Sequence, residues 1–401
     1  MKIGVIREGK TPPDSRVPLT PAQCRQFQEK FPQIDLAVQP SEGRCYSDEE
    51  YQEAGIRMQR DMSDRDVLLG VKEVPIDQLL DKKMYFFFSH TIKAQPYNQG
   101  LLQAMVRQGI QMVDWETLTD DKGRRVIAFG RWAGIVGAHN GLWTWGQRTG
   151  AFSLPRAKDC RDFAELKSHY QGITWPPIKI ALSGGGRVTG GSIEVLEAAG
   201  IRRVSPQEFL NQDFDEAVYA QLDCPDIYRK RGSDGSEDFD FPHFFGNPGD
   251  YEGIFEPYTR VADLFINAIY WDPAAPVFFT REDMQRDDFR IRVIADITCD
   301  IEGSVPSTLR ATTIPEPLYG YDPQSGSEVE PHGDAVIDTM SIDNLPNELP
   351  RDASEAFGDQ FLEFVASELL EGGSMIDGAT ICRKGALNAP FEYLRDYLEG
   401  R

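Results

Sequence analysis

Two residues that can transfer protons each follow a strand-like segment in the first quarter of the chain. Lys72 comes directly after the apolar run DVLLGV, and His90 ends the run YFFFSH. Residues just beyond the strand ends of an open parallel sheet line its ligand crevice. An imidazole and an amine there suit a reaction that makes or breaks a carbon–nitrogen bond. A structural histidine and a surface lysine are the alternatives that spacing alone leaves open.

The composition limits the classes of function. A chain of 401 residues suits two domains. No apolar run reaches the ~18 residues that span a bilayer, and the N-terminal MKIGVIREGK predicts a strand and no signal peptide. The six cysteines are scattered without a CxxC pair, which predicts a reducing cytoplasm and neither a zinc site nor a disulfide framework. The formal charge of −22 repels nucleic acid and anionic membranes, so an anionic substrate needs local arginines.

The order of the predicted elements indicates two α/β units. Strand-like and helix-like segments alternate through residues 1–130, which predicts a mostly parallel sheet. Residues 130–150 are rich in small and aromatic side chains and predict a tightly packed helix leading to a second unit. Residues 228–250 predict a polar loop or lid to which we assign no function. A later amphipathic helix is predicted to begin at Asp352 or Ser354.

A glycine-rich turn opens the second unit. In the segment IKIALSGGGRVTGGSIEVLEAAGI, a strand runs into Gly184-x-Gly186-x-x-x-Gly190 and then into an amphipathic helix. Such a turn lets backbone N–H groups approach a pyrophosphate at a helix N-terminus. The strand before it and the helix after it favour a dinucleotide site over a plain tight turn.

The acidic residue typical of NAD sites is missing at the expected distance. That acid usually lies about 20 residues past the turn and binds the ribose 2′-hydroxyl. Counting from Gly186 reaches Ser205, and the nearest carboxylate is Glu208. The absence leaves NADP open, with Arg202 or Arg203 able to bind a 2′-phosphate; the alternative places both arginines on the solvated surface.

Several segments together resemble one enzyme family. The segments are YFFFSHTIKAQ, FGRWAGIVGA, INAIYW, ADITCD followed by GSV, and SIDNLPNELPRDASEAFGD. They resemble the lysine–2-oxoglutarate reductase family, the lysine-forming saccharopine dehydrogenases, which includes the reductase half of the bifunctional aminoadipic semialdehyde synthase. That family is grouped with alanine dehydrogenase and the nicotinamide nucleotide transhydrogenase. The resemblance runs from residue 1 to about residue 370.

The resemblance implies an α/β fold of two Rossmann-like domains, with parallel sheets flanked by helices and the active site in the interdomain cleft. Residues 1–130 and 305–401 would form the catalytic domain, and residues 131–304 the dinucleotide-binding domain. The family reaction joins the ε-amine of lysine to 2-oxoglutarate, loses water to give an imine, and reduces the imine to saccharopine with NAD(P)H. Lys72 and His90 match the catalytic pair, and burial would have to lower the pKa of the lysine. Glu73 and Glu116 could tune the pair.

The resemblance also implies binding residues. Those for substrate are Arg16, Gln95, Arg125, Phe129 and Tyr270. Those for the dinucleotide are Arg124, Gly184, Gly186, Arg187, Val188, Gly190, Ile269, Cys299 and Asp300.

The cofactor and the partners follow from the same comparison. The turn GGGRVTGG resembles the NADPH-using bifunctional enzyme more than the NAD-using fungal enzyme, which tilts the expectation toward NADP. The expected partners are saccharopine, lysine and 2-oxoglutarate, with no nucleic acid, membrane or metal, for a cytoplasmic monomer or homodimer. Two alternatives stay open: an alanine dehydrogenase-type enzyme, and a non-catalytic redox sensor that binds the dinucleotide.

Overall fold

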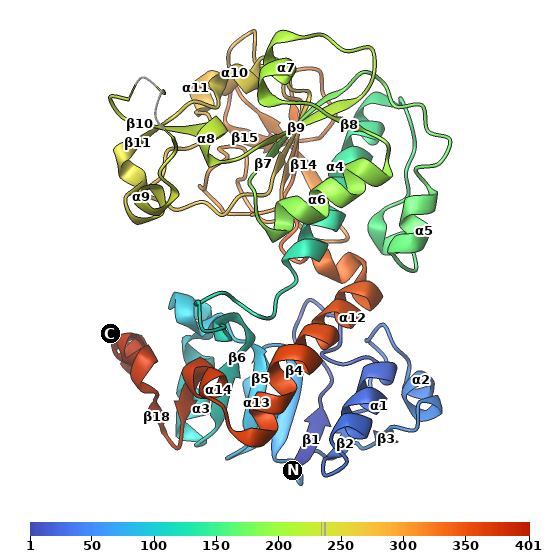
Figure 1. The fold of residues 1–401 in the computed structure, drawn as a ribbon, viewed down its shortest axis with the longest axis vertical. Coiled ribbons are helices and arrows are strands. Elements are labelled where there is room, and N and C mark those ends of the chain that lie inside the picture. Colours follow the sequence, from blue (N-terminus) through green and yellow to red (C-terminus); the bar gives the residue numbers. More distant parts are fainter. Residues whose placement is uncertain (234, 236–237) are drawn as a thin grey trace. The chain divides into compact units, whose positions relative to one another are not determined.

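The computed structural model describes residues 1–233, 235 and 238–401. The chain forms two compact units (Figure 1). The first unit comprises Met1–Phe129 and Pro350–Arg401, and the second comprises Gly130–Leu349. Among the described residues, no helix combines the length and the apolar character needed to cross a membrane.

The predicted return of the chain to the first domain at residue 305 is wrong. Residues 305–349 belong to the second unit. Strand β16 (Ile337–Met340) pairs in parallel with β13 (Val293–Asp296), and β14 (Leu318–Asp322) then pairs with β16. Without these strands, β13 would expose an unpaired edge, so this sheet is completed before the chain leaves the unit.

The first unit is built on an eight-stranded sheet with the order β18-β17-β6-β5-β4-β1-β2-β3. The pairs among β1 to β6 are parallel, whereas β17 and β18 add an antiparallel edge beside β6. The strands are β1 (Lys2–Val5), β2 (Asp35–Val38), β3 (Arg57–Met58), β4 (Val67–Lys72), β5 (Met84–Phe88), β6 (Gln111–Asp114), β17 (Thr380–Arg383) and β18 (Ala386–Leu387).

Helices from both ends of the chain cover this sheet. Figure 1 shows α12 and α13 crossing in front of its strands, and the Phe357 ring of α12 contacts buried Trp115 at a centroid distance of 5.2 Å. The predicted start at Asp352 or Ser354 is two or more residues late, because α12 begins at Pro350. The helices are α1 (Pro21–Lys30), α2 (Asp48–Glu53), α3 (Gln99–Arg107), α12 (Pro350–Gln360), α13 (Ala366–Glu371), α14 (Ser374–Ala379) and α15 (Arg395–Glu399).

The second unit has its own eight-stranded sheet, with the order β15-β14-β16-β13-β12-β7-β9-β8. The pairs β8–β9, β9–β7, β7–β12, β12–β13 and β13–β16 are parallel, whereas β14 and β15 form an antiparallel edge beside β16. A separate antiparallel pair is formed by β10 and β11. The remaining strands are β7 (Lys179–Ser183), β8 (Arg202–Arg203), β9 (Val218–Leu222), β10 (Tyr228–Lys230), β11 (Tyr251–Gly253), β12 (Leu264–Asn267) and β15 (Ser327–Val329).

Two helices of the second unit approach each other unusually closely. The predicted helix at 130–150 is α4 (Gly130–Thr149), and it packs against α6 (Arg187–Ala198). A Cβ on Gly134 would lie 1.8 Å from the Val188 carbonyl oxygen, and one on Gly191 would lie 2.0 Å from the Arg131 carbonyl oxygen. Only glycine fits at both positions, so glycines in this region serve helix packing as well as the turn.

Short helices complete the second unit. The predicted loop at 228–250 contains β10 and α9, while Asp234, Ser236 and Glu237 lie outside the described residues. The short helices are α5 (Phe163–Ser168), α7 (Pro206–Asn211), α8 (Cys224–Ile227), α9 (Phe241–Gly246), α10 (Glu256–Thr259) and α11 (Arg281–Met284).

Candidate active site

The topology of the first sheet identifies where a ligand would bind. The chain runs from β1 to β2 and β3 on one side, and then crosses to β4 on the other side of β1. The carboxyl ends of strands at such a switch point form the usual crevice of an open α/β sheet. The ionisable residues that follow these strands and their neighbours are Glu8 and Lys10 after β1, Lys72 and Glu73 at the end of β4, His90 after β5 and Glu116 after β6.

Lys72 is positioned by an irregular end of β4. The register of β4 against β5 shifts before Lys72. The Glu8 carboxylate accepts hydrogen bonds from the backbone N–H groups of Val71 (2.7 Å) and Lys72 (2.8 Å). The Trp115 indole donates to the Gly70 carbonyl oxygen at 2.8 Å. Side chains thus replace part of the strand ladder, and the bulge re-aims the last residue of β4.

The environment of Lys72 weakens its hold on a proton. Burial, and then the charge of Arg16, lower the pKa of Lys72 to about 8, although Asp14 and Glu73 act in the opposite direction. Burial thus lowers the pKa of this amine, as the predicted catalytic role requires. Burial, and then Asp14, raise the pKa of Glu8 to about 8. Lys72 and Glu8, near the ends of two adjacent strands, therefore both change their protonation state close to neutral pH.

His90 is held by a polar loop. Its backbone is left-handed, with φ +53, which is uncommon for a residue with a side chain. Buried Ser89 fixes the loop, because its N–H and Oγ contact Asp114 and its Oγ accepts from the Thr91 N–H at 3.2 Å. The Asn98 amide donates to the Ser89 carbonyl oxygen at 3.0 Å. These contacts fix the direction in which the imidazole leaves the sheet.

The His90 ring faces Glu73 across a short gap. His90 Nδ1 and Glu73 Oε2 are 3.8 Å apart, which is too long for a hydrogen bond. Both atoms are buried and lack a hydrogen-bond partner among the described residues, whereas Glu73 Oε1 pairs with Lys10 Nζ at 2.6 Å. Burial, and then Lys72, lower the pKa of His90 to about 4, so the ring is neutral at neutral pH. A polar group of a ligand would satisfy both orphaned atoms.

Arg16 is part of the framework of the first unit. It is 3% exposed, and its Nε and Nη2 bind Asp14 Oδ1 and Oδ2 at 3.0 and 2.6 Å. Its guanidinium lies 4.2 Å from the centre of the Phe129 ring, which stacks on Phe357 at 4.8 Å. Burial raises the pKa of Asp14, but Arg16 outweighs this and holds it well below its usual range. Arg16 therefore already has a carboxylate partner within the protein.

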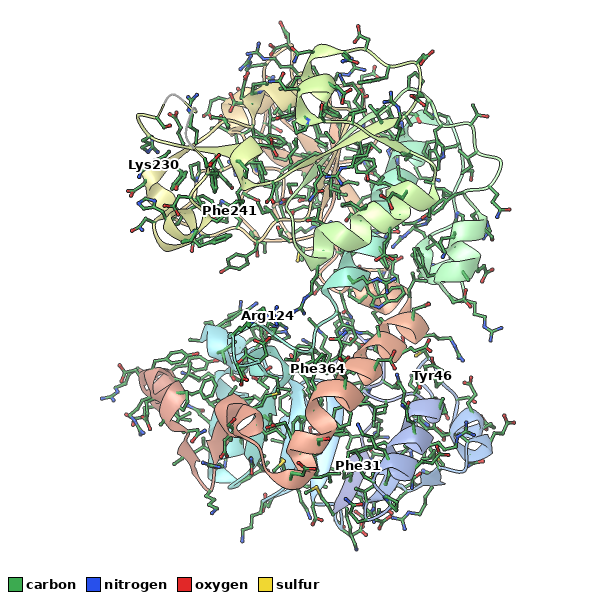
Figure 2. The ribbon with its side chains drawn as sticks, viewed as in Figure 1. Phe31, Tyr46, Arg124, Lys230, Phe241 and Phe364 are labelled. Atoms are coloured by element: carbon green, nitrogen blue, oxygen red, sulfur yellow. The ribbon has the colours of Figure 1, made fainter. Side chains whose placement is uncertain are left out.

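The predicted substrate residues Arg125 and Gln95, and Arg124, which was predicted to bind the dinucleotide, are more accessible. Arg125 is 40% exposed along its side chain, and its Nη1 lies 3.5 Å from Glu116 Oε1. Arg124, labelled in Figure 2, is exposed and binds Asp120 through Nε at 2.8 Å. Gln95 is exposed, and its carbonyl oxygen accepts a hydrogen bond from the Tyr397 hydroxyl. Of these residues, Arg125 contacts the strand-end cluster, by which we mean the ionisable residues after the strands of the first sheet: Glu8, Lys10, Lys72, Glu73, His90 and Glu116. The contact is made with Glu116.

The glycine turn of the second unit leaves open space where an anion could approach. Gly184 has φ +96, and a Cβ there would lie 2.7 Å from Thr189 Oγ1. A Cβ on Gly185 would lie 2.5 Å from Asp223 Oδ2. By contrast, a Cβ on Gly186, the N-cap of α6, would meet nothing within 4 Å. The first two glycines are required by crowding, and the third opens the helix N-terminus.

A pocket of about 460 Å³ lies beside this turn. It is lined by residues 185–188, by Asp223 and Cys224, by Phe241 and Phe245 of α9, and by residues 268–270 after β12. The predicted residues Arg187, Val188, Ile269 and Tyr270 thus come together here, and Tyr270 is 87% exposed. Gly190, Cys299 and Asp300 are not among the described residues that line this pocket.

Asp223 was not predicted from the sequence. The expected position of the acid lies after the next strand in the chain, but that strand, β8, is a two-residue edge strand, and β9 is the neighbour of β7. Strand β9 ends at Leu222, directly before Asp223. The predicted absence of a carboxylate near Ser205 holds for β8, but β8 is not the strand beside β7. The available signal was the run VYAQL followed by an aspartate. Glu8 and Lys10 were also not predicted as site residues.

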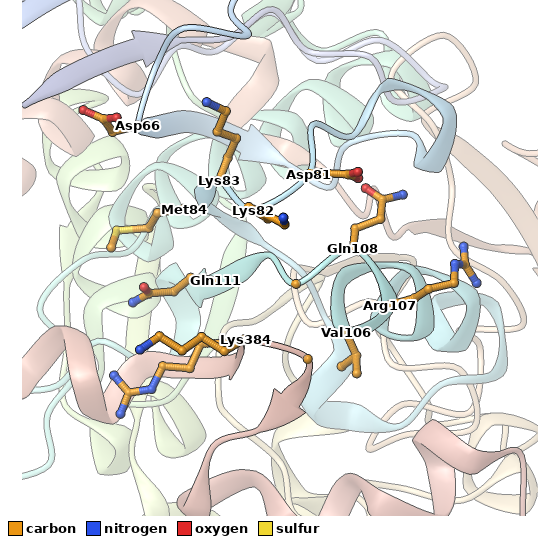
Figure 3. Close-up of a pocket in the computed structure, with 13 residues that line it drawn as sticks. Asp66, Asp81, Lys82, Lys83, Met84, Val106, Arg107, Gln108, Gln111 and Lys384 are labelled. Carbon is orange, nitrogen blue, oxygen red and sulfur yellow. The ribbon is translucent and has the colours of Figure 1, made fainter.

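A larger pocket, of about 760 Å³, lies at the opposite edge of the first sheet, where β5 and β6 begin (Figure 3). Lys82, Lys83, Arg107, Arg383 and Lys384 line it together with Asp66 and Asp81. It lacks the histidine and the buried carboxylates of the strand-end cluster. We use its lysines as comparison positions for the cluster.

The chain resembles enzymes of amino-acid metabolism. The N-terminal domain family of alanine dehydrogenase/PNT matches residues 4–136. The alpha-aminoadipic semialdehyde synthase of Arabidopsis thaliana is 28% identical over 98% of this chain and 41% of its own, and the mitochondrial synthase of Mus musculus is 29% identical over 97% and 47%. The chain thus spans less than half the length of these relatives. A saccharopine dehydrogenase [NAD(+), L-lysine-forming] of Emericella nidulans is 26% identical over 89% of both chains.

Solved structures share the fold. An L-alanine dehydrogenase matches with a TM-score of 0.67 and 17% identity, over 99% of this chain and 100% of its own. A transhydrogenase from Sinorhizobium meliloti matches with a TM-score of 0.61 and 16% identity, over 97% and 99%. At these identities the matches establish a shared architecture of two Rossmann-like α/β units.

Proposed function

We propose that the chain belongs to the alanine dehydrogenase and transhydrogenase superfamily and is a lysine–2-oxoglutarate reductase, interconverting L-lysine, 2-oxoglutarate and NAD(P)H with saccharopine and NAD(P)+. The observation that carries the proposal is the cluster of Lys72, His90 and Glu73 at the switch point of the first sheet. A relative named saccharopine dehydrogenase [NAD(+), L-lysine-forming] matches over 89% of this chain, which supports the choice of substrate.

The cluster supplies the proton transfers that the reaction needs. When the lysine amine attacks the keto carbon, its nitrogen must lose a proton, and neutral His90 can accept it. The carbinolamine loses its hydroxyl as water only if the oxygen is protonated, and Lys72, with a pKa of about 8, is charged at neutral pH and can donate. Glu73 Oε2 faces His90 Nδ1 and would orient the substrate group that lies between them.

A reduced nicotinamide dinucleotide, when bound, supplies the hydride that reduces the imine carbon. The second unit fits such a group, because Gly186 leaves the N-terminus of α6 open and the pocket beside it reaches Ile269 and Tyr270. Residues 184–188 would hold the pyrophosphate through their backbone. Ile269 would provide an apolar surface for the rings of the cofactor.

The substrate carboxylates have one direct candidate in the first unit. Arg125 is partly exposed and lies near Glu116, so it can bind a carboxylate with two parallel hydrogen bonds. Arg16 uses Nε and Nη2 on Asp14, and we propose that it acts through the position of Phe129 and through its effect on Lys72. This assigns the two arginines, predicted alike from sequence, to different roles.

An alanine dehydrogenase-type reaction is the second candidate, because the family model and a solved structure both carry that name. The same lysine and histidine types would serve it. It needs to hold one carboxylate, whereas saccharopine has three. A redox sensor without catalysis would have no use for a lysine whose charge lowers the pKa of a nearby histidine in a partly buried setting.

The test is a steady-state assay that follows the absorbance of the reduced nicotinamide. Lysine with 2-oxoglutarate is compared with pyruvate and ammonia, each with NADH and with NADPH. We expect saturable oxidation of the cofactor with lysine and 2-oxoglutarate, at a higher kcat/KM than with pyruvate and ammonia. Faster turnover of pyruvate and ammonia would contradict the proposal, as would cofactor binding without turnover of either pair.

A further inference from the structure

We infer that the pocket beside the glycine turn binds the adenosine half of a dinucleotide that lacks a 2′-phosphate, with Asp223 accepting hydrogen bonds from the ribose hydroxyls. The cofactor would then be NAD(H), which reverses the tilt toward NADP. This inference rests on the proposed function and specifies the cofactor of the same reaction.

The sheet order places Asp223 where a ribose acceptor belongs. In a Rossmann unit the acidic residue follows the strand next to the one that leads into the glycine turn. Here β7 leads into the turn, and β9 is its neighbour in parallel register, with Leu222 opposite Ser183. Asp223 and Gly184 are therefore the first residues past two adjacent strand ends.

The contacts aim the Asp223 carboxylate at the turn. Its Oδ2 lies 2.5 Å from where a Cβ of Gly185 would be, so only a glycine allows this approach. The Cys224 N–H donates to Oδ1 at 2.8 Å, and the Asp223 N–H donates to Asp226 Oδ2 at 2.9 Å. The side chain is thus fixed at the pocket wall before any ligand arrives, which lowers the entropic cost of binding.

The charge at this wall discriminates between the two cofactors. A 2′-phosphate carries about two negative charges near neutral pH and would face the Asp223 carboxylate. Neither arginine proposed for a phosphate lines the pocket: Arg202 binds Glu216 at 2.7 Å, and Arg203 binds Gln221 at 2.6 Å. A ribose 2′-hydroxyl, in contrast, donates to a carboxylate in a favourable, charge-assisted hydrogen bond.

Two aromatic rings give the pocket a surface for the base. Phe241 and Phe245 of α9 line it although they are 38% and 66% exposed. Their ring centres are 6.2 Å apart, and Phe239 contacts Phe241 at 5.0 Å while Phe244 contacts Phe245 at 5.7 Å. Figure 2 shows Phe241 on this part of the second unit. Exposed aromatic rings beside a polar anchor favour a planar ligand such as adenine, which gives the segment 228–250 a function.

The test measures binding separately from turnover. Dissociation constants for NADH and NADPH are obtained by calorimetry, together with those for ADP-ribose and its 2′-phosphate, which lack the nicotinamide ring. The intact chain should bind NADH at least about tenfold more tightly than NADPH, and ADP-ribose more tightly than its 2′-phosphate. Asp223→Ser should weaken NADH and tighten NADPH until the preference is lost or reversed.

Two controls separate this effect from general damage. Glu197→Gln removes one exposed charge at the far end of α6 and should leave the NADH/NADPH ratio unchanged. Phe245→Ala should weaken NADH and ADP-ribose by about three- to tenfold without changing that ratio, because it removes stacking and not charge. Phe364 of the first unit, which is 39% exposed, should have no effect on binding when it is changed to Ala.

The outcomes distinguish this inference from the proposed function. A preference for NADPH in the intact chain, an unchanged ratio in Asp223→Ser, or no binding of either dinucleotide would overturn the assignment of Asp223. Binding with the expected preference, but no turnover of lysine with 2-oxoglutarate, would retain the assignment and overturn the proposed function.

Discussion

The carboxyl ends of the two sheets are built in opposite ways. Those of the first unit carry ionisable side chains whose pKa values are shifted by burial and by neighbouring charges, namely Lys72, His90 and Glu8. Those of the second unit carry three consecutive glycines and open space at Gly186. Proton transfer requires groups whose ionisation is coupled in a poorly solvated setting, whereas holding a pyrophosphate requires bare backbone.

This difference also separates what can be tested. In the first unit, a substitution removes a charge on which its neighbours depend, so its effects spread to stability and to pH dependence. In the second unit, a substitution at Gly186 fills space that no other residue uses, so its effect is confined to the ligand. The four predictions below follow this contrast from the largest expected effect to the smallest.

Arg16→Ala should lower the free energy of unfolding by about 3–5 kcal/mol, because it leaves the buried Asp14 carboxylate without its paired charge. Arg125→Ala should change stability by less than about 1 kcal/mol, since that arginine is 40% exposed and 3.5 Å from Glu116. It should instead weaken saccharopine binding by about 2–5 kcal/mol. Urea unfolding and substrate KM check both, and equal loss of stability in the two variants would refute the division of roles.

Lys72→Met should reduce kcat by about 10² or more, the usual contribution of a general acid or base, and His90→Gln should do the same. The wild-type rate should fall as pH rises through about 8, where Lys72 loses its proton, and this limb should vanish in Lys72→Met. Cofactor affinity should not change. Lys82→Met, in the basic pocket at the other edge of the sheet, serves as the matched control and should retain full kcat. Wild-type turnover in Lys72→Met or in His90→Gln would show that the substituted residue takes no part in the mechanism.

His90→Gln should reduce the dependence of stability on pH. The pKa of His90 is about 4 in the folded chain against 6.5 for the free side chain, so the unfolded chain binds a proton that the folded chain does not. The free energy of unfolding should therefore fall as pH drops from about 6.5 toward 4, by about 1–2 kcal/mol at pH ~5 from this group. The drop between neutral and acid pH should be smaller in the variant. An equal drop would show that His90 keeps its ordinary affinity for protons.

Gly186→Val should weaken dinucleotide binding by about tenfold or more, because the branched side chain would fill the open space at the helix N-terminus. Its free energy of unfolding should be nearly unchanged, since a Cβ there meets no atom within 4 Å. Gly190→Ala faces equally open space but is outside the pocket lining, and should keep most of the affinity. The larger loss at Gly190 would place the pyrophosphate deeper along α6 than we propose.

The local sequence pattern was sufficient to predict the strands and the ionisable residues that follow them. Apolar runs such as DVLLGV and YFFF predict buried parallel strands, and these became β4 and β5 with Lys72 and His90 at their ends. The glycine turn between a strand and a helix was likewise readable, because it is a local arrangement. A pattern of this kind is short range, so it contains the residue types of a site but not their distances.

The tertiary structure decided what depends on strand order and on burial. Residues 305–349 complete the second sheet, and β9 rather than β8 lies beside β7, so Asp223 and not the region of Ser205 follows the neighbouring strand. In the folded chain Arg16 is buried and paired with Asp14, whereas the side chain of Arg125 is partly exposed. The sequence predicted the same role for both arginines, because each lies in a motif that matches the family. Sequence by itself determined which groups this protein has for its chemistry; packing of residues distant in the chain determined which groups share a charge environment, because desolvation and Coulomb interactions depend on distance in space.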